Sequence, residues 1–157
     1  MTKSIVSFAN LLLAALVVGT IFGIWLGYNP ADLSSRAYLE QQQHAIRALN
    51  VTMPVLGAVT ILLTLTSALL ARSNRRLLAL LLGAALFFLA AGIVTRFLNQ
   101  PINAMVIAWS VDAPPENWIE LRDEWWRWHV VRTGFGIVGL GLLIAANLVK
   151  GGRGPRA

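Results

Sequence analysis

The sequence contains no cysteine, which excludes disulfide bonds, thiolate metal ligands and cysteine nucleophiles. Charged residues are scarce, at 13% of the chain, whereas about 25% is usual in soluble domains. Hydrophobic residues make up 57%, which excludes a disordered chain and argues against a soluble globular domain. The sequence also lacks a Walker-type phosphate loop, zinc-finger spacing and a local Ser/His/Asp signature. The composition therefore indicates a protein that is surrounded by an apolar environment rather than by water.

Long hydrophobic runs, by contrast, are abundant. Four of them reach the roughly 20 residues that a helix needs to cross a bilayer, and they lie at about 5–28, 52–71, 77–98 and 130–149. The first run exceeds the roughly 7–15 apolar residues of a signal peptide, and no A-x-A site follows it, so we expect it to remain as a helix. Because the runs fill more than half of the chain, we expect an all-α, integral membrane four-helix bundle forming a single domain over residues 1–157.

The distribution of charge predicts an orientation. One end of the spans carries seven cations and no acid: Lys3, Arg72, Arg75, Arg76, Lys150, Arg153 and Arg156. The other end carries all seven acids and the remaining arginines. Because short cytoplasmic loops are rich in Lys and Arg, we expect both termini in the cytoplasm, in a bacterial inner membrane. The net charge of +6 is then a topology signal, and nucleic acid is not an expected partner.

The two connections on the acid-bearing side predict additional helical segments. Between the first two spans, Ser34 or Ser35 is placed to cap a helix, and Pro54 is expected to bend or interrupt the chain before the second span. Between the last two spans, a turn at Asp112–Pro115 precedes a helix that should start at Pro115 and run without proline into the fourth span.

The last helix carries the most informative pattern. Positions that step by four and three form one stripe on it: Trp118, Arg122, Trp125, His129, Arg132 and Gly136. Guanidinium and imidazole groups are costly against lipid, so the stripe should face the bundle interior, where Arg96 arrives from the third span. Ionisable groups in a membrane domain predict a functional site. The alternatives are an aromatic belt at the membrane interface and a structural ion-pair network with Glu40 or Glu124.

Glycines mark two of the predicted spans. Gly19, Gly23 and Gly27 form a small-residue face on the first span, which is typical of close helix packing. A second interpretation is that Gly23 and Gly27 leave space for a flat ligand. Further glycines at 134, 136, 139 and 141 crowd the fourth span and also predict close packing.

Two segments carry a family resemblance. FLNQPINAMVIAW at 97–109 and LRDEWWRWHVVRT at 121–133 resemble the anthrone oxygenase-like membrane family, in an N-x-P-x-N segment followed by R-x-x-W-x-x-x-H-x-x-R-T. The matching residues are Asn99, Pro101, Asn103, Arg122, Trp125, His129, Arg132 and Thr133. The glycine-rich first span and a glutamine, Gln41 or Gln42, also fit, so the likeness covers nearly the whole chain.

The resemblance implies a cofactor-independent oxygenase, because some relatives oxidise anthrones to anthraquinones with O2 alone. A base removes an acidic C–H proton, and the resulting enolate passes an electron to O2. The implied catalytic residues are His129 as the base, with Arg132 and Arg96 stabilising the oxyanion. The implied substrate-binding residues are Asn99, Asn103, Arg122, Trp125, Tyr38 and Gln42. The expected partners are a lipophilic substrate, O2 and the bilayer, and an oligomer is possible.

Other functions remain open at this point. A quinol or another lipophilic phenol meets the same physical requirements as an anthrone. His44 and His129 are the two histidines, and a pair of histidines on facing helices can hold a haem. A non-catalytic accessory subunit, or one that binds a small molecule, is the remaining alternative. A bound flat aromatic molecule favours the enzyme, and co-purification with a larger complex favours the accessory subunit.

Overall fold

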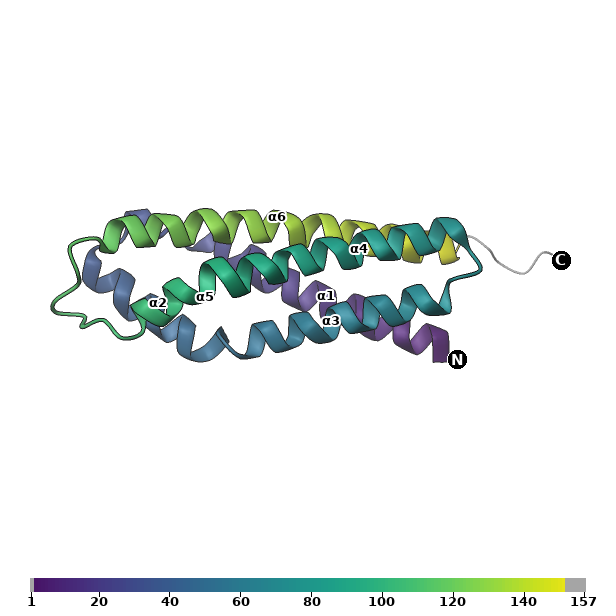
Figure 1. Cartoon of the computed structure of the whole chain (residues 1–157), viewed down its shortest axis with the longest axis horizontal. Coiled ribbons are helices and arrows are strands. Elements are labelled where there is room, and N and C mark those ends of the chain that lie inside the picture. The colour runs from purple at the N-terminus through teal and green to yellow at the C-terminus, as the bar shows by residue number, and fades with distance from the viewer. Residues whose placement is uncertain (1, 152–157) are drawn as a thin grey trace.

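A computed structural model describes residues 2–151, and within this range the chain is helical without a β-strand element. The four long helices are α1 (Thr2–Gly27), α3 (Thr52–Leu70), α4 (Arg75–Val94) and α6 (Trp118–Gly151). They run side by side, and the start of α1, the α3–α4 turn and the end of α6 share one end of the bundle (Figure 1). All four contain segments long and apolar enough to cross a membrane. The predicted all-α membrane bundle is therefore confirmed.

Short helical segments close the other end of the bundle (Figure 1). They are the 3-10 turn η1 (Pro30–Asp32), α2 (Ser35–Leu49), the π-helical turn η2 (Thr95–Asn99) and α5 (Gln100–Val106). Ser34 caps α2, because its hydroxyl accepts a hydrogen bond from the Ala37 N–H at 3.3 Å. The break between α2 and α3 precedes Pro54, which lies in the first turn of α3, where a missing N–H costs nothing.

The interior consists of two apolar clusters. One lies between the long helices and is built from small and aliphatic side chains, among them Ala14, Val18, Ala68, Leu81, Ala84, Phe88, Leu143 and Ala146. The other joins α2, α5 and the first turns of α6: Tyr38, Leu39, Ile46, Ile102, Val106 and Trp125. Close approach of α4 and α6 requires a glycine, since a Cβ at Gly139 would lie 2.7 Å from the Phe88 ring.

The sequence predicts that the glycine face of α1 packs against a neighbouring helix, but in the structure this face is exposed. Gly19, Gly23 and Gly27 are exposed, and a Cβ at any of them would meet nothing within 4 Å. The prediction of close helix packing at this face is therefore wrong within this bundle, since the buried side of α1 is the one that carries Ala14 and Val18. The interpretation that Gly23 and Gly27 leave space for a flat ligand stays a prediction. Of the four α6 glycines singled out in the sequence, those at 136 and 139 are in close contact, while those at 134 and 141 face open space.

Candidate functional site: a two-part cavity around Arg132

Two adjacent cavities lie among the helices on the side of the bundle where α2 and η2 are found. The polar compartment, of about 170 Å³, is lined by several polar side chains: Tyr28, Gln41, Gln42, Asn50, Thr95, Asn103, Trp125 and Arg132. The apolar compartment, of about 190 Å³, is lined mainly by small and aliphatic residues of α1, α3 and α4. Each is larger than the roughly 150 Å³ cavity that accommodates benzene.

The two compartments are neighbours, because five residues line both: Ile21, Met53, Pro54, Thr95 and Arg132. Arg132 contributes the only charged group at this junction. Together the compartments fall within the usual size of small-molecule sites, about 300–1,000 Å³. The arrangement is therefore two neighbouring spaces with a guanidinium at their shared wall.

Arg132 is held in place by its neighbours. Its Nη2 and Nε donate to Nδ1 of His129, at 2.8 and 3.2 Å, and its Nη1 lies 3.4 Å from Oγ1 of Thr95. The guanidinium also lies 5.8 Å from the centre of the Trp125 ring. In the part of the chain that the structure describes, no carboxylate lies within salt-bridge distance of it. Arg132 therefore presents an unneutralised, oriented cation to both compartments.

His129 lies directly behind this cation. It is fully buried, and its ring stacks on Trp125 at 5.1 Å and on Trp126 at 5.5 Å. Its Nε2 lies 3.1 Å from the carbonyl oxygen of Ile21. Because a carbonyl and a guanidinium have fixed roles, Nε2 carries the proton and donates, while Nδ1 accepts from Arg132. His129 is thus a neutral imidazole that lines neither compartment and reaches the cavity through Arg132.

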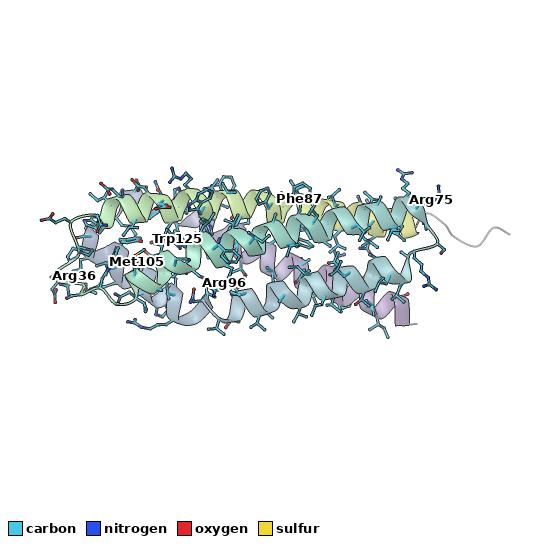
Figure 2. All side chains as sticks on the ribbon, viewed as in Figure 1. Arg36, Arg75, Phe87, Arg96, Met105 and Trp125 are labelled. Atoms are coloured by element: carbon cyan, nitrogen blue, oxygen red, sulfur yellow. The ribbon has the colours of Figure 1, made fainter. Side chains whose placement is uncertain are left out.

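Arg96 is the second cation of the site. It belongs to η2, a π-helical turn, which is a distortion frequent at functional sites. Its side chain is exposed and lines the apolar compartment, on the side of η2 that faces α3 (Figure 2). Within residues 2–151 it has no carboxylate partner. The two arginines therefore place two unpaired positive charges on one cavity.

The two asparagines of the N-x-P-x-N segment have different positions. Asn103 lines the polar compartment, accepts from Nε1 of Trp125 at 2.8 Å and donates to Oδ1 of Asn50 at 2.8 Å. Asn99 is fully buried and donates to the Trp125 carbonyl oxygen at 3.0 Å, away from both compartments. These amide contacts tie α5 to α6 and to the corner between α2 and α3, which fixes the shape of the polar compartment.

The predicted site residues divide into two groups. Those that line the cavity are Gln42, Arg96, Asn103, Trp125 and Arg132. Those that do not are Tyr38, Asn99, Arg122 and His129. Tyr38 is fully buried and packs on Trp118, with the ring centres 5.8 Å apart, while Arg122 pairs with Asp123 at 2.8 Å and covers the same Trp118.

The inward orientation of the α6 stripe is confirmed, since Arg122, Trp125, His129 and Gly136 are buried. The structural ion-pair alternative is not observed for the site arginines. Glu40 pairs instead with Arg36 at 3.0 Å. Glu124 accepts from the Trp128 indole at 3.4 Å. Trp126, a tryptophan to which the aromatic-belt alternative applies, is half-buried against His129.

Several cavity residues were not predicted as ligand contacts: Tyr28, Asn50 and Thr95. Tyr28 ends the first apolar run, and Thr95 directly precedes Arg96, but neither belongs to a motif. Asn50 is the C-cap of α2, and its place between two predicted helices was the one signal in the sequence that could have pointed to it. The haem alternative fits poorly, since both His129 nitrogens are occupied and His44 is exposed on α2.

Comparison with known families adds one decisive match. A sequence model of the family described as anthrone oxygenase matches residues 43–142, well over half of the chain. The chain belongs to the anthrone oxygenase family. The matched range contains Arg96, Asn103, His129 and Arg132, whereas the α1 wall of the cavity precedes it. No curated protein and no solved structure showed a significant match.

Proposed function

We propose that this member of the anthrone oxygenase family is a membrane-embedded oxygenase acting on an anthrone-like or related lipophilic phenolic ketone. The observation that carries the proposal is the pair of unneutralised arginines, Arg132 and Arg96, on a largely apolar, ligand-sized cavity. Cationic donors in a poorly hydrated site stabilise a developing oxyanion far more than they do in water. A substrate that becomes an enolate suits this environment.

The proposed reaction needs no redox cofactor. Loss of one C–H proton gives an enolate, which transfers one electron to O2, and the two radicals combine to form a C–O bond. The peroxide takes up a proton, and loss of the second C–H proton with cleavage of the O–O bond releases water and leaves a carbonyl. One substrate and one O2 thus give one quinone and one water.

In this proposal Arg132 and Arg96 bind the enolate oxygen, and the Asn103 amide orients the substrate from the polar compartment. Trp125 offers a ring face beside Arg132. His129 takes the substrate proton on Nδ1 as Arg132 turns from that nitrogen to the enolate oxygen, because a guanidinium has no lone pair with which to accept the proton. The contact of 2.8 Å between Nη2 and Nδ1 supports this assignment, since the accepting lone pair of His129 points toward Arg132.

The test uses purified protein in lipid nanodiscs with a hydroxylated anthrone at neutral pH. O2 consumption and quinone formation are measured against empty nanodiscs, which report spontaneous oxidation. Arg132→Met should lower the protein-dependent rate by about 100-fold or more. Arg127→Met is the matched control, because Arg127 is exposed on the same helix and lines neither compartment. A wild-type rate equal to that of empty nanodiscs contradicts the proposal.

A second candidate function is ligand binding without catalysis. It is favoured by one observation: the residues that line the two compartments include no Asp, Glu, His or Lys. Without a direct base, the site binds an acidic phenol as its anion and leaves it unchanged. Tight binding of such a phenol, with the same Arg132 dependence but no O2 consumption for any tested ketone, distinguishes this role from the oxygenase.

A further inference from the structure

The apolar compartment contains open space beside two glycines. A Cβ at Gly57 would meet nothing within 4 Å, and one at Gly92 would meet only Cδ1 of Ile61, at 4.0 Å. The neighbouring Phe88, by contrast, is pressed against Gly139 on its other side. The open space beside Gly57 and Gly92 therefore contrasts with the close contact between α4 and α6 at Gly139.

Most polar groups on this compartment already have partners. The Thr60 hydroxyl donates to the Leu56 carbonyl oxygen at 2.9 Å, and the Thr95 hydroxyl donates to that of Ala91 at 2.8 Å. Away from the arginine end, a ligand oxygen would lose its hydrogen bonds to water without replacement, which costs free energy. Hydrocarbon meets no such penalty there.

The polar compartment has more polar groups on its wall than the apolar one, beside several aliphatic side chains. Some of these groups are already paired, such as the Tyr28 hydroxyl, which donates to Gln42 at 3.2 Å. The side-chain N–H groups of Gln41 and Asn50 have no acceptor among the described residues, so oxygen atoms of a ligand find donors there and at Arg132. The two compartments therefore suit the two halves of an amphipathic molecule.

The apolar compartment also opens sideways. Ala58 on α3 and Gly92 on α4 line it and are exposed, as is Arg96. These positions fall within the segments able to cross a membrane. Small side chains at the opening let a lipid-soluble molecule pass between α3 and α4 from the bilayer.

We propose that the ligand is a phenolic or hydroxyquinone-type ring that carries an alkyl or prenyl chain. The ring occupies the polar compartment with its acidic oxygen on Arg132, and the chain occupies the apolar compartment. Among the anthrone-like and phenolic ketones of the proposed function, those with such a chain fit better than those with oxygens on every ring, because some oxygens would otherwise enter the compartment without donors. This inference rests on the proposed function only for the chemistry of the ring.

The experiment measures binding separately from turnover. The probes are 2-hydroxy-1,4-naphthoquinone and its derivative with a saturated chain of about eight carbons at the adjacent ring carbon. Dissociation constants are obtained by fluorescence quenching in nanodiscs of one lipid composition. In the wild type the chain should strengthen binding by about tenfold or more.

Gly57→Leu fills the apolar compartment from α3, and Gly92→Leu fills it from α4 as an independent variant. Each should bring the ratio of the two dissociation constants close to that expected from bilayer partitioning alone. Gly141→Leu is the matched control, because Gly141 is exposed, has open space at its Cβ and lines neither compartment. It should keep the wild-type ratio.

Two results overturn the inference. One is a chain that strengthens binding equally in the wild type and in both filled variants, which shows that the gain comes only from the bilayer. The other is the absence of any gain in the wild type, as when a lipid acyl chain already fills the compartment. A chain effect confined to the open compartment supports the inference even where no O2 is consumed, a result that fails the proposed function alone.

Discussion

Arg132 donates two hydrogen bonds to Nδ1 of His129, which lies three residues earlier on the same face of α6. The contact orients the guanidinium and occupies the imidazole nitrogen that a general base would use. Thr95 completes the arrangement from η2. The histidine of the family motif thus acts on the cavity through the arginine that follows it, and removing either residue changes the other.

Substitution of His129 distinguishes a role as acceptor of the substrate proton from a purely structural role. His129→Asn places an amide oxygen near the position of Nδ1, so it still accepts from Arg132 but takes up no proton. If His129 accepts the substrate proton, we expect His129→Asn to bind substrate normally and to lose about 10²–10⁴-fold in kcat. The measurements are kcat and ligand affinity in nanodiscs, together with a thermal melt. If His129→Asn keeps the wild-type kcat while His129→Ala has a lowered melting temperature, the residue only positions Arg132.

The two site arginines should differ in their tolerance of lysine. Arg132 uses three nitrogens on His129 and Thr95, a fork that one ammonium cannot reproduce. Arg132→Lys should therefore weaken binding of an anionic phenol by about tenfold or more, since hydrogen bonds to charged groups contribute about 1.5–3 kcal/mol. Arg96→Lys keeps the charge that Arg96 supplies and should change the dissociation constant by less than about threefold. Equal losses in both variants contradict this division of roles.

The bundle was predictable because its determinants are local. Apolar runs of membrane length, the Ser34 cap and the break before Pro54 each depend on a few neighbouring residues, and the structure has all of them. The continuous α6 was predictable for the same reason, since no proline interrupts it, although it begins at Trp118 and not at Pro115 as predicted. Helical periodicity also identified the buried face of α6 correctly.

The positions of individual site residues were less predictable, because they depend on which side of a neighbouring helix faces the cavity. His129 and Arg132 share one face of α6, yet only Arg132 reaches the cavity, since a long flexible side chain extends past a ring held by Ile21. The exposed glycines of α1 illustrate the same limit. A spacing of four residues shows that Gly19 and Gly23 share a face but does not say which face packs.

The orientation of the bundle can be tested by cysteine labelling without background signal from the protein itself, because the chain has no cysteine. Ser73, at the α3–α4 turn, and Ala113, in the α5–α6 connection, are both exposed. Arg75 and Arg36 mark these two opposite ends (Figure 2). A membrane-impermeant maleimide added to intact cells should label Ala113→Cys and not Ser73→Cys, because cation-rich loops stay in the cytoplasm. Labelling of Ser73→Cys alone means that the topology is inverted.

Substitution of Tyr38 tests whether this residue belongs to the core, as the structure indicates, or contacts the ligand. Its side chain is fully buried, and its hydroxyl has no hydrogen-bond partner among the described residues. Burial raises the pKa of Tyr38 above its ordinary value, an effect that nearby Arg122 partly opposes. The family resemblance places Tyr38 at the substrate, whereas the structure places it against Trp118, outside both compartments.

Tyr38→Phe should therefore leave ligand affinity unchanged and keep or raise stability at neutral pH. An unsatisfied buried hydroxyl costs about 1–3 kcal/mol, and its removal relieves that cost. The pH dependence follows from the raised pKa of Tyr38. Below about pH 10, the unfolded value, the phenol is neutral in both states and its ionisation does not affect stability; as the pH rises above that value toward the folded pKa, the unfolded chain loses the proton more readily and stability declines. Thermal melts from pH 8 to about pH 11 should show a steeper alkaline loss in the wild type than in Tyr38→Phe. If Tyr38→Phe melts like the wild type but binds a phenolic ligand about tenfold more weakly, Tyr38 contacts the substrate, because a direct contact changes affinity without changing the fold.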